Sequence, residues 1–292
     1  MVISNQQYLK SLFYLCRPAQ WIKNAFVLAP LVFTGLFIEI IPALNALLAT
    51  LLFCIASSTS YIVNDLFDIE SDRKHSLKSK TRPLASGELS EKQARILLYV
   101  LYGVLALGFL FSYQVMLVII AYLALNLAYT YKLKHQPVID IFTIACGFVL
   151  RVYAGAMALD VPVSAWMFIT TLSLALYLAT IKRRQELLLR GSSGREVLEK
   201  YSIKLVDRYA EMSATSALIF YSLFVMSDRP EMLVSIPLVL FGLFRYWFVV
   251  ETLEKGESPT DVLLKDRQLL LTVLLWCLCA IIMNWPDRFF SN

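Results

Sequence analysis

Charged residues are scarce in this chain. Asp, Glu, Lys and Arg make up only 17% of its 292 residues, whereas 58% are hydrophobic and the mean hydropathy is +0.63. A soluble globular domain is about half apolar and about a quarter charged. The composition therefore excludes an ordinary soluble domain and indicates a polytopic membrane protein.

Patterns for disulfides, zinc sites and histidine-dependent catalysis are missing as well. The five cysteines mostly lie in apolar segments without zinc-ligand spacing, so we interpret them as small core residues rather than a disulfide framework. The two histidines, His75 and His135, lie in expected loops, where no pairing with a nucleophile can be argued. A cleavable signal pattern, linkers, low-complexity tracts and internal repeats are also absent. Residues 1–292 are therefore expected to form one integral-membrane domain.

Apolar runs recur along the chain at lengths near the ~20 residues that cross a bilayer. They predict nine membrane-spanning helices and an all-α fold. The expected spans are 24–41, 43–63, 93–111, 115–131, 138–159, 163–181, 209–227, 232–250 and 268–285. Ser90 and Gln93 have the spacing of a capping box at the start of the third span.

Positive charge is distributed unevenly between the two sides of these expected spans. Of the 27 Lys and Arg residues, all but four lie in the N-terminal segment or the long linkers. The exceptions are Arg229 and Arg288 on the other side, and Arg151 and Arg245 within spans. Because cytoplasmic loops are rich in Lys and Arg, we expect the N-terminus and the long loops in the cytoplasm and the C-terminus outside.

Four oxygen-bearing side chains directly follow the second expected span. Asn64, Asp65, Asp68 and Asp72 are three, four or seven residues apart, so they share one face if the helix continues. Mg²⁺ prefers carboxylate oxygen and keeps open positions for phosphate. We interpret the segment as a metal–pyrophosphate site, with Asp65 and Asp68 as the strongest ligand candidates. The alternative is a solvated acidic turn.

Basic side chains accompany these acids. Arg73 and Arg82 lie in the same loop, as an anion-binding pocket requires. Lys23 begins the first expected span, where it either faces the bundle or anchors the helix at the interface. Lys132 and Lys134 end the fourth span and taken alone are typical of snorkelling lysines.

Ionisable residues also occur within or at the ends of later spans. Asp140 lies just inside the fifth span, and Arg151 follows eleven residues later, three helical turns along the same face. We interpret Arg151 as a residue that lines a cavity and contacts phosphate there, since guanidinium binds phosphate bidentately. A structural ion pair with Asp140 or another acid is the alternative. Lys182 and Arg183 close the sixth span, where a simple positive-inside anchor also explains them.

The motif Asn64-Asp65-x-x-Asp68-x-x-x-Asp72, with Arg82-Pro83-Leu84 and the region around Tyr131 and Lys132, resembles the UbiA superfamily of intramembrane prenyltransferases. The resemblance covers nearly the whole chain. It implies a nine-helix bundle around a central cavity open to the cytosolic side. It also implies that the acids hold Mg²⁺ on a diphosphate.

One departure distinguishes the chain within this superfamily. Where typical prenyltransferases carry a second aspartate-rich motif after the sixth helix, this chain has Lys182-Arg183-x-x-Glu186. Basic residues there suit a bare phosphate better than a second metal. Together with three other segments, this motif is similar to the decaprenyl-phosphate phosphoribosyltransferase branch. Those segments are Arg17-Pro18-x-Gln20-Trp21-x-Lys23-Asn24, Leu133-Lys134-His135-Gln136, and Pro259-x-Asp261 with Asp266-Arg267.

The resemblance implies transfer of 5-phosphoribose from phosphoribosyl pyrophosphate to a polyprenyl (decaprenyl) phosphate, with release of pyrophosphate, for arabinose-lipid and envelope-glycan precursors. It also implies a location in the inner (plasma) membrane of a bacterium. The implied cofactor is Mg²⁺, and no nucleic-acid partner is expected. Formation of an oligomer is possible. The implied metal ligands are Asn64, Asp65 and Asp68, with Asp72 in support of catalysis. The implied substrate-binding residues are Lys23, Arg73, Arg82, Tyr131, Lys132, Lys134, Asp140, Arg151, Lys182, Arg183 and Glu186.

Three alternatives compete with this reaction. An aromatic prenyltransferase of the 4-hydroxybenzoate type, from quinone biosynthesis, shares the fold and the first motif, but the basic segment after the sixth span argues against it. A transporter or channel would use Asp140 and Arg151 along an ion route, yet only Arg229 and Arg288 of the basic residues lie on the outer side. A structural scaffold would not need four oxygen donors on one face.

Overall fold

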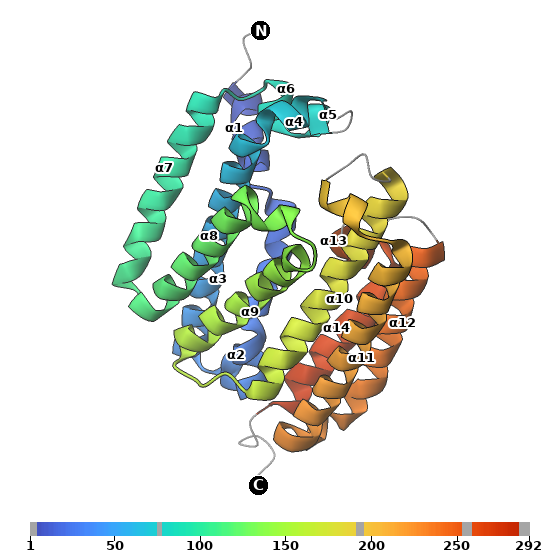
Figure 1. The fold of residues 1–292 in the computed structure, drawn as a ribbon. Coiled ribbons are helices and arrows are strands. Elements are labelled where there is room, and N and C mark those ends of the chain that lie inside the picture. Colours follow the sequence, from blue (N-terminus) through green and yellow to red (C-terminus); the bar gives the residue numbers. More distant parts are fainter. Residues whose placement is uncertain (1–4, 75–77, 191–195, 253–258, 286–292) are drawn as a thin grey trace.

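The computed structural model describes residues 5–74, 78–190, 196–252 and 259–285, and within these ranges it contains helices but no strand (Figure 1). The expected all-α fold is confirmed. The helices, with η marking 3₁₀ segments, are α1 (Asn5–Leu15), η1 (Pro18–Leu28), α2 (Ala29–Thr34), η2 (Leu36–Ile38), α3 (Ile40–Phe67), α4 (Ile69–Lys74), α5 (Lys78–Thr81), α6 (Pro83–Ser86), α7 (Glu91–Leu107), η3 (Gly108–Leu110), α8 (Tyr113–Tyr131), η4 (Leu133–His135), α9 (Ile139–Leu159), α10 (Ala165–Arg190), η6 (Glu196–Lys200), α11 (Ile203–Asp228), η7 (Pro230–Ser235), α12 (Ile236–Thr252), α13 (Pro259–Lys265) and α14 (Arg267–Met283).

Seven helical stretches in the described ranges are long and apolar enough to cross a membrane. They correspond to the second through the eighth expected spans, from α3 to the continuous stretch of η7 and α12. The ninth expected span is α14, which has only 17 residues. The first is divided among η1, α2 and η2. The structure therefore supports a polytopic bundle, and the number nine stays a prediction.

The first expected span is broken for local reasons. Pro18 opens η1, and Pro30 lies in the first turn of α2. Gly35 then adopts a φ of 75°, which ends α2 and turns the chain into η2. The eleven-residue length of η1 is unusual, because 3₁₀ runs beyond three or four residues are uncommon. Contacts with neighbouring helices must therefore stabilise this segment.

Helix α9 is the most buried of the candidate spans. It contacts η1, α3, α8 and α10, because small residues along it let neighbouring backbones approach closely. Gly155 is the tightest of these positions. A Cβ atom there would lie 1.9 Å from the carbonyl oxygen of Val27 in η1. The missing side chain thus seats η1 directly against α9.

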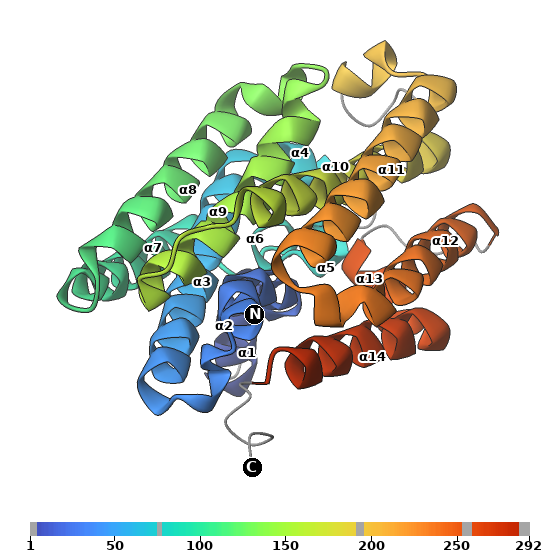
Figure 2. The same cartoon turned by 90° about the horizontal axis from the view of Figure 1, so that it is seen from below.

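The long helices close into a ring that includes α9. Going round, α3 contacts α9, α9 contacts α10, α10 contacts α11, and α11 contacts α12. Helix α14 then packs on α12 and contacts α2, and α2 contacts α3, as the view from below shows (Figure 2). The short helices α1, α4, α5 and α6 gather at one end of this ring (Figure 1). The acidic motif lies at that end, where α3 passes into α4.

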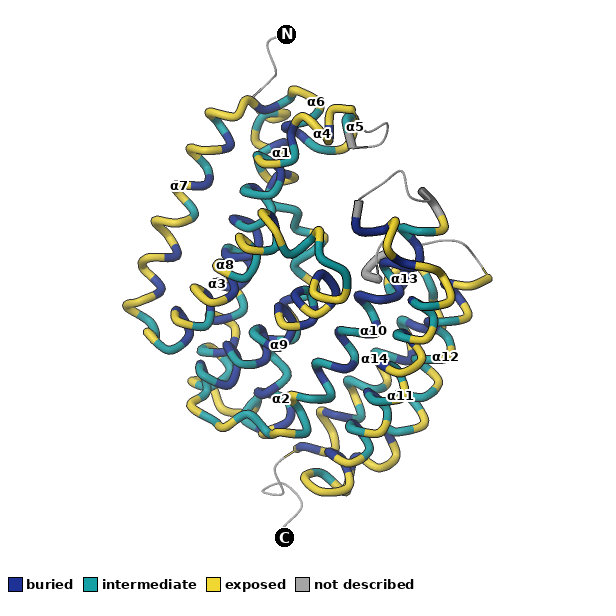
Figure 3. Tube along the Cα trace, viewed as in Figure 1, coloured by how far each residue is buried: buried dark blue, intermediate teal, exposed yellow. Residues whose placement is uncertain are grey.

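Many large hydrophobic side chains are exposed. Exposed positions recur along the helices, for example along α7 (Figure 3). Leu110 and Ile40 are 86% and 77% exposed. Monomeric soluble proteins rarely expose extended apolar surface, whereas lipid tails cover such surface in a bilayer. Together with the seven apolar helices, this surface identifies an integral membrane protein.

Two smaller expectations have clear outcomes. The capping box is confirmed, because Ser90 accepts the Gln93 amide and the Gln93 side chain accepts the Ser90 amide at the start of α7. All five cysteines are free, so the expected absence of disulfides holds. Their interpretation as core residues is right only for Cys54, because Cys146 is exposed and the others are half-buried.

Candidate active site

The acidic motif keeps helical spacing through a break at Asp68. Helix α3 ends at Phe67 and α4 begins at Ile69. The Asp68 amide donates to the Asn64 carbonyl at 2.9 Å, and the Asp72 amide donates to the Asp68 carbonyl at 2.8 Å. The backbone hydrogen bonds therefore continue across the break. They hold the acids at the spacing that the sequence predicted.

Two of these acids are buried against arginines. Asp65 and Asp72 are only 3% and 2% exposed. Arg82 donates to Asp65 at 2.9 Å and also pairs with Asp72, so one guanidinium bridges both carboxylates. Arg17 forms a second ion pair with Asp65. The alternative of a solvated acidic turn is wrong for these two residues.

The third acid faces a more open environment. Asp68 is 29% exposed and accepts a hydrogen bond from Lys134 of η4 at 2.9 Å. Beside it, the Phe67 ring packs edge-on against Tyr131, with 4.3 Å between the ring centroids. These contacts bring the end of α8 and the η4 turn against the acids. We call Asp65, Asp68 and Asp72, with Arg17, Arg82 and Lys134, the motif cluster.

Arg17 reaches the motif cluster because η1 is fixed on α3. Arg17 adopts a φ of 52° just before Pro18, and its guanidinium stacks on the Tyr61 ring at 5.0 Å. Trp21 of η1 donates to the Ser58 hydroxyl at 3.0 Å, and Ser58 in turn donates to the Cys16 carbonyl at 3.0 Å. Further along η1, Lys23 is half-buried.

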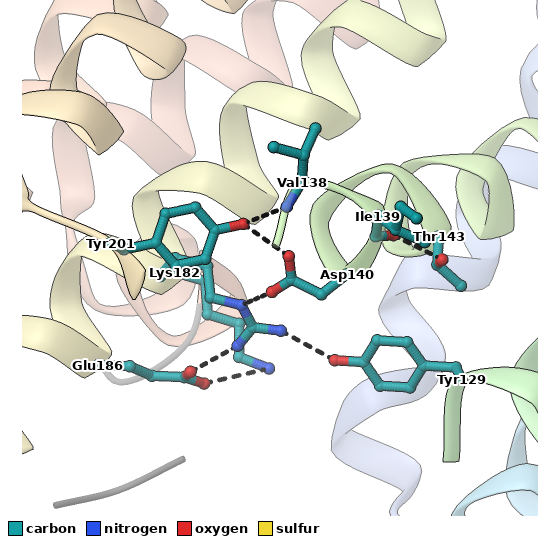
Figure 4. Close-up of polar contacts among 9 residues, drawn as sticks. Tyr129, Val138, Ile139, Asp140, Thr143, Lys182, Glu186 and Tyr201 are labelled. Carbon is teal, nitrogen blue, oxygen red and sulfur yellow. Dashed lines mark hydrogen bonds and ion pairs between the residues drawn. The ribbon is translucent and has the colours of Figure 1, made fainter. Parts of the chain in front are cut away.

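A second charged cluster surrounds Arg183, which has no exposed surface. Figure 4 shows Tyr129, Asp140, Glu186 and Tyr201 of this cluster. The Arg183 guanidinium donates to Asp140 at 2.6 Å, to Glu186 at 2.5 Å and to the Tyr129 hydroxyl at 2.8 Å. Tyr201 donates to the other oxygen of Asp140 at 2.7 Å. We call these five residues the Arg183 cluster. Lys182 approaches its edge, 4.0 Å from Glu186.

Arg151 lies in neither cluster. It is 4% exposed and donates to Asn24 at 2.8 Å, to the Gly147 carbonyl at 2.7 Å and to the Tyr122 hydroxyl at 3.2 Å. Three aromatic rings, those of Phe53, Tyr122 and Phe148, lie about its guanidinium at 4.9–5.3 Å. The suggested pairing with Asp140 is wrong, because Asp140 pairs with Arg183. Arg151 instead ties η1 to α9 through Asn24.

The remaining predicted residues are distributed around these clusters. Asn64 is half-buried next to Asp65, whereas Arg73 and Lys132 are exposed on α4 and at the end of α8. In the late motif, Asp266 caps α14 and accepts two hydrogen bonds from Arg245, at 3.1 and 2.7 Å. These bonds hold the pKa of Asp266 below its usual range, although burial opposes the shift. The side chain of Asp261 lies outside the described residues.

Sequence reasoning missed three members of these clusters. Arg17 was seen only as part of a motif, although it pairs with Asp65. Tyr129 and Tyr201 had no signal in the sequence, because they are 54 and 61 positions away from the partners that they contact. A tyrosine in an apolar run reads as a core residue until the partner of its hydroxyl is known.

The donor chemistry of the motif cluster suits a hard divalent ion, but the carboxylates are not gathered around one point. Among the described residues, no group of three or more His, Cys, Asp or Glu side chains lies close enough to hold one metal. Arg17, Arg82 and Lys134 occupy the carboxylates instead. Cationic groups at each acid show that the cluster attracts positive charge, and a metal ion would compete with them.

Known proteins resemble this chain in sequence and in fold. The model of the UbiA prenyltransferase family matches residues 27–265. Decaprenyl-phosphate phosphoribosyltransferase from Mycolicibacterium smegmatis is 35% identical, covering 89% of this chain and 88% of that protein. Its namesake from Corynebacterium glutamicum is 33% identical, covering 91% and 84%.

The fold likeness extends to more distant proteins. The structure of a UbiA homolog from Archaeoglobus fulgidus bound to GPP and Mg²⁺ aligns with a TM-score of 0.72 at 20% identity, covering 94% of this chain and 99% of that one. The family model spans most of the sequence, and the solved structure shares the helical arrangement. The chain belongs to the UbiA prenyltransferase family.

Proposed function

We propose that this protein is a membrane transferase that moves 5-phosphoribose from phosphoribosyl pyrophosphate to a polyprenyl phosphate and releases pyrophosphate. One observation carries the proposal. Proteins named decaprenyl-phosphate phosphoribosyltransferase are 33–35% identical to the chain over about nine-tenths of its length. The Lys182-Arg183-x-x-Glu186 segment supports the same reaction, because it stands where typical prenyltransferases carry a second aspartate-rich motif.

The motif cluster is the proposed site for the leaving pyrophosphate. Asn64, Asp65 and Asp68 would hold Mg²⁺, with Asp72 in support. When bound, Mg²⁺ would neutralise charge on the departing phosphates. Asp68 is the most accessible of the three acids, since it is 29% exposed, and it accepts a hydrogen bond from Lys134. Arg82 would fix the positions of Asp65 and Asp72, since its guanidinium contacts both carboxylates.

The surrounding cations are the proposed anion-binding groups. Lys134 and Arg82 already lie against the acids, so both are placed to meet a pyrophosphate bound there. The wider set that we propose for the two substrates consists of Lys23, Arg73, Tyr131, Lys132, Arg151, Lys182, Arg183, Asp140 and Glu186. The full burial of Arg183 favours an indirect role, in which it holds Glu186 and Asp140 in place.

The reaction requires little acid–base chemistry. A phosphate oxygen of the lipid attacks the anomeric carbon of ribose, forming a new carbon–oxygen bond as the bond to pyrophosphate breaks. The lipid phosphate is already anionic near neutral pH, so no strong general base is needed. The protein would contribute mainly by positioning two anions together and stabilising the charge that develops on the leaving group.

The proposed orientation places both clusters at the cytosolic side of a bacterial inner membrane. In this arrangement phosphoribosyl pyrophosphate enters from the cytosol, and the lipid phosphate lies in a central cavity with its tail in the bilayer. The location of nearly all Lys and Arg in the long linkers supports this orientation. Both chain termini, assigned to opposite sides, lie outside the described residues.

A substrate-pair assay tests the proposal. The purified protein in detergent is given Mg²⁺ with ribose-labelled phosphoribosyl pyrophosphate and decaprenyl phosphate, or with a labelled polyprenyl diphosphate and 4-hydroxybenzoate. We expect ribose label in the lipid phase only with the first pair, and none after chelation of the metal. Product formation only with the second pair would establish the aromatic prenyltransferase instead. Solute flux in proteoliposomes without either product would establish a transporter.

A further inference from the structure

Val138 holds an uncommon backbone conformation between η4 and α9. Its φ and ψ are 69° and −48°, and the Ile139 amide donates to the Pro137 carbonyl at 2.8 Å. These features define a γ-turn of the rare, strained type. A β-branched residue with positive φ is a genuine outlier, so surrounding contacts must hold the turn in place.

Tyr201 supplies such a contact. Its hydroxyl oxygen accepts the Val138 amide at 2.6 Å and donates to Asp140 at 2.7 Å (Figure 4). One hydroxyl therefore spans the turn and the start of α9. Burial raises the pKa of Tyr201, and its bond to Asp140 also raises it. The hydroxyl thus keeps the proton that it donates to Asp140 throughout the pH range of ordinary assays.

A short chain of backbone hydrogen bonds connects this turn to the motif cluster. The Asp140 amide donates to the Gln136 carbonyl at 3.0 Å, and the Gln136 amide donates to the Leu133 carbonyl at 3.1 Å. Lys134 lies within this bonded segment and reaches Asp68 at 2.9 Å. Displacement of the turn would therefore displace the η4 backbone that carries Lys134.

The ring and backbone of Tyr201 are held by contacts other than those of its hydroxyl. The residue is 7% exposed and packs in a core with Ile141, Val197, Leu198 and Val206. Its amide donates to the Leu198 carbonyl at 3.1 Å. The aromatic ring is thus anchored between η6 and α11, and its hydroxyl presents a rigid contact to the γ-turn.

We propose that Tyr201 is a positioning residue, which locks the Val138 turn and thereby fixes Lys134 opposite Asp68 at the site for the pyrophosphate-bearing donor. The part that concerns the donor rests on the proposed function, whereas the lock itself does not. Tyr201 contacts no reacting atom in this role. It links the connection between α10 and α11 to the geometry of the motif cluster.

The first test is kinetic. Tyr201→Phe keeps the ring and its packing but removes the hydroxyl, and Tyr246→Phe is the matched control, since Tyr246 is a buried core tyrosine of α12. We expect Tyr201→Phe to raise KM for phosphoribosyl pyrophosphate about tenfold, the factor for one lost hydrogen bond, with a smaller fall in kcat. Combined with Lys134→Ala, it should add little to the effect of Lys134→Ala alone. Fully additive effects, or kinetics equal to those of Tyr246→Phe, would overturn the proposal.

The second test does not depend on any substrate. Hydrogen exchange of the peptide covering residues 133–140 is measured in wild type and in both variants. In Tyr201→Phe we expect exchange at the Val138 amide to accelerate about tenfold or more, because this amide loses its acceptor. Exchange should not change in Tyr246→Phe. Unchanged exchange in Tyr201→Phe rejects the lock whatever the reaction is, whereas faster exchange without phosphoribosyl transfer by wild type rejects only the proposed function.

Discussion

The two charged clusters at the polar end of the bundle hold their cations in different ways. In the Arg183 cluster, Arg183 and Asp140 are both completely enclosed, and the guanidinium meets two carboxylates and a tyrosine hydroxyl. In the motif cluster, Arg17, Arg82 and Lys134 remain partly exposed beside their acids. The Arg183 cluster is therefore suited to holding helices in place. The motif cluster keeps its cations partly exposed, which the proposed exchange with a substrate or metal requires.

Burial has opposite consequences in the two clusters. Breaking a buried ion pair leaves an unpaired charge in a low-dielectric interior, which is strongly destabilising. A partly exposed ion pair contributes little to stability, because water and salt screen it. We therefore expect a change at Asp68, which is 29% exposed, to remove activity with modest loss of stability, and changes in the Arg183 cluster to reduce stability first.

The largest expected effect is on turnover. Asp68→Ala or Asp65→Ala should lower Mg²⁺-dependent turnover by about 10³-fold or more, since metal stabilisation of a leaving group amounts to several kcal/mol. Turnover is measured with the substrate pair described above, and folding by gel filtration in detergent. Asp160→Asn, at the left-handed C-cap of α9, serves as control. Near-normal turnover in either alanine variant would refute the metal role.

The next effect is on stability. Arg183→Ala should lower the free energy of unfolding by about 3–5 kcal/mol, because Asp140 is left as an unpaired buried charge. Thermal unfolding in detergent measures the loss. Arg95→Ala is the control, since the Arg95–Glu91 pair is largely exposed. This substitution should change the unfolding temperature little. If the two variants unfold at the same temperature, the distinction between the clusters is wrong.

A smaller effect concerns how η1 carries Arg17 to the motif cluster. Gly155→Ala should destabilise the protein by about 1–3 kcal/mol, because the new methyl group overlaps the Val27 carbonyl and overpacks the interface. Gly103→Ala on α7 is a matched control, because a Cβ there meets nothing within 4 Å. That control should be neutral or stabilising by about 0.5–1 kcal/mol. Thermal unfolding in detergent measures both variants. Equal unfolding temperatures for Gly155→Ala and Gly103→Ala would show that η1 can shift away from α9 freely.

The smallest effect is the pH dependence of the Arg245–Asp266 pair, which lies in neither cluster. The pKa of Asp266 is lowered from the ordinary 3.8 by its hydrogen bonds from Arg245. This pair therefore stabilises the fold above pH 3.8, and the contribution is lost as pH falls below that value through the pKa of the folded state. Arg245→Gln should be less stable than wild type at neutral pH. The gap in melting temperature should narrow on acidification, and a gap that widens would contradict the assignment.

Several features of the site could be predicted from local spacing. The acids of the motif follow one another within two helical turns, so their shared location depends only on helical geometry. The capping box at Ser90 depends on residues three positions apart and is confirmed. The expected membrane spans from α3 to α12 follow from length and hydropathy, which do not require knowledge of packing.

Pairings between distant segments could not be predicted in this way. Arg151 and Asp140 share a helical face, which made an ion pair reasonable, yet Arg183 from α10 takes Asp140. Arg151 instead bonds Asn24, which is 127 positions away. The break of the first expected span into η1, α2 and η2 also depends on contacts with α9 that no local pattern encodes.

The sequence by itself determined that this protein is an α-helical membrane protein of the UbiA family with an acidic motif at the mouth of a span. Apolar run length and the spacing within one helix are local quantities, and they carry the fold class and the acidic face; the family followed from the resemblance of the motifs. Only the tertiary structure decided which cation meets which acid, and that Tyr201 holds the Val138 turn. Those pairings depend on how separate helices cross, because each charge in a low-dielectric interior must find its partner on another segment.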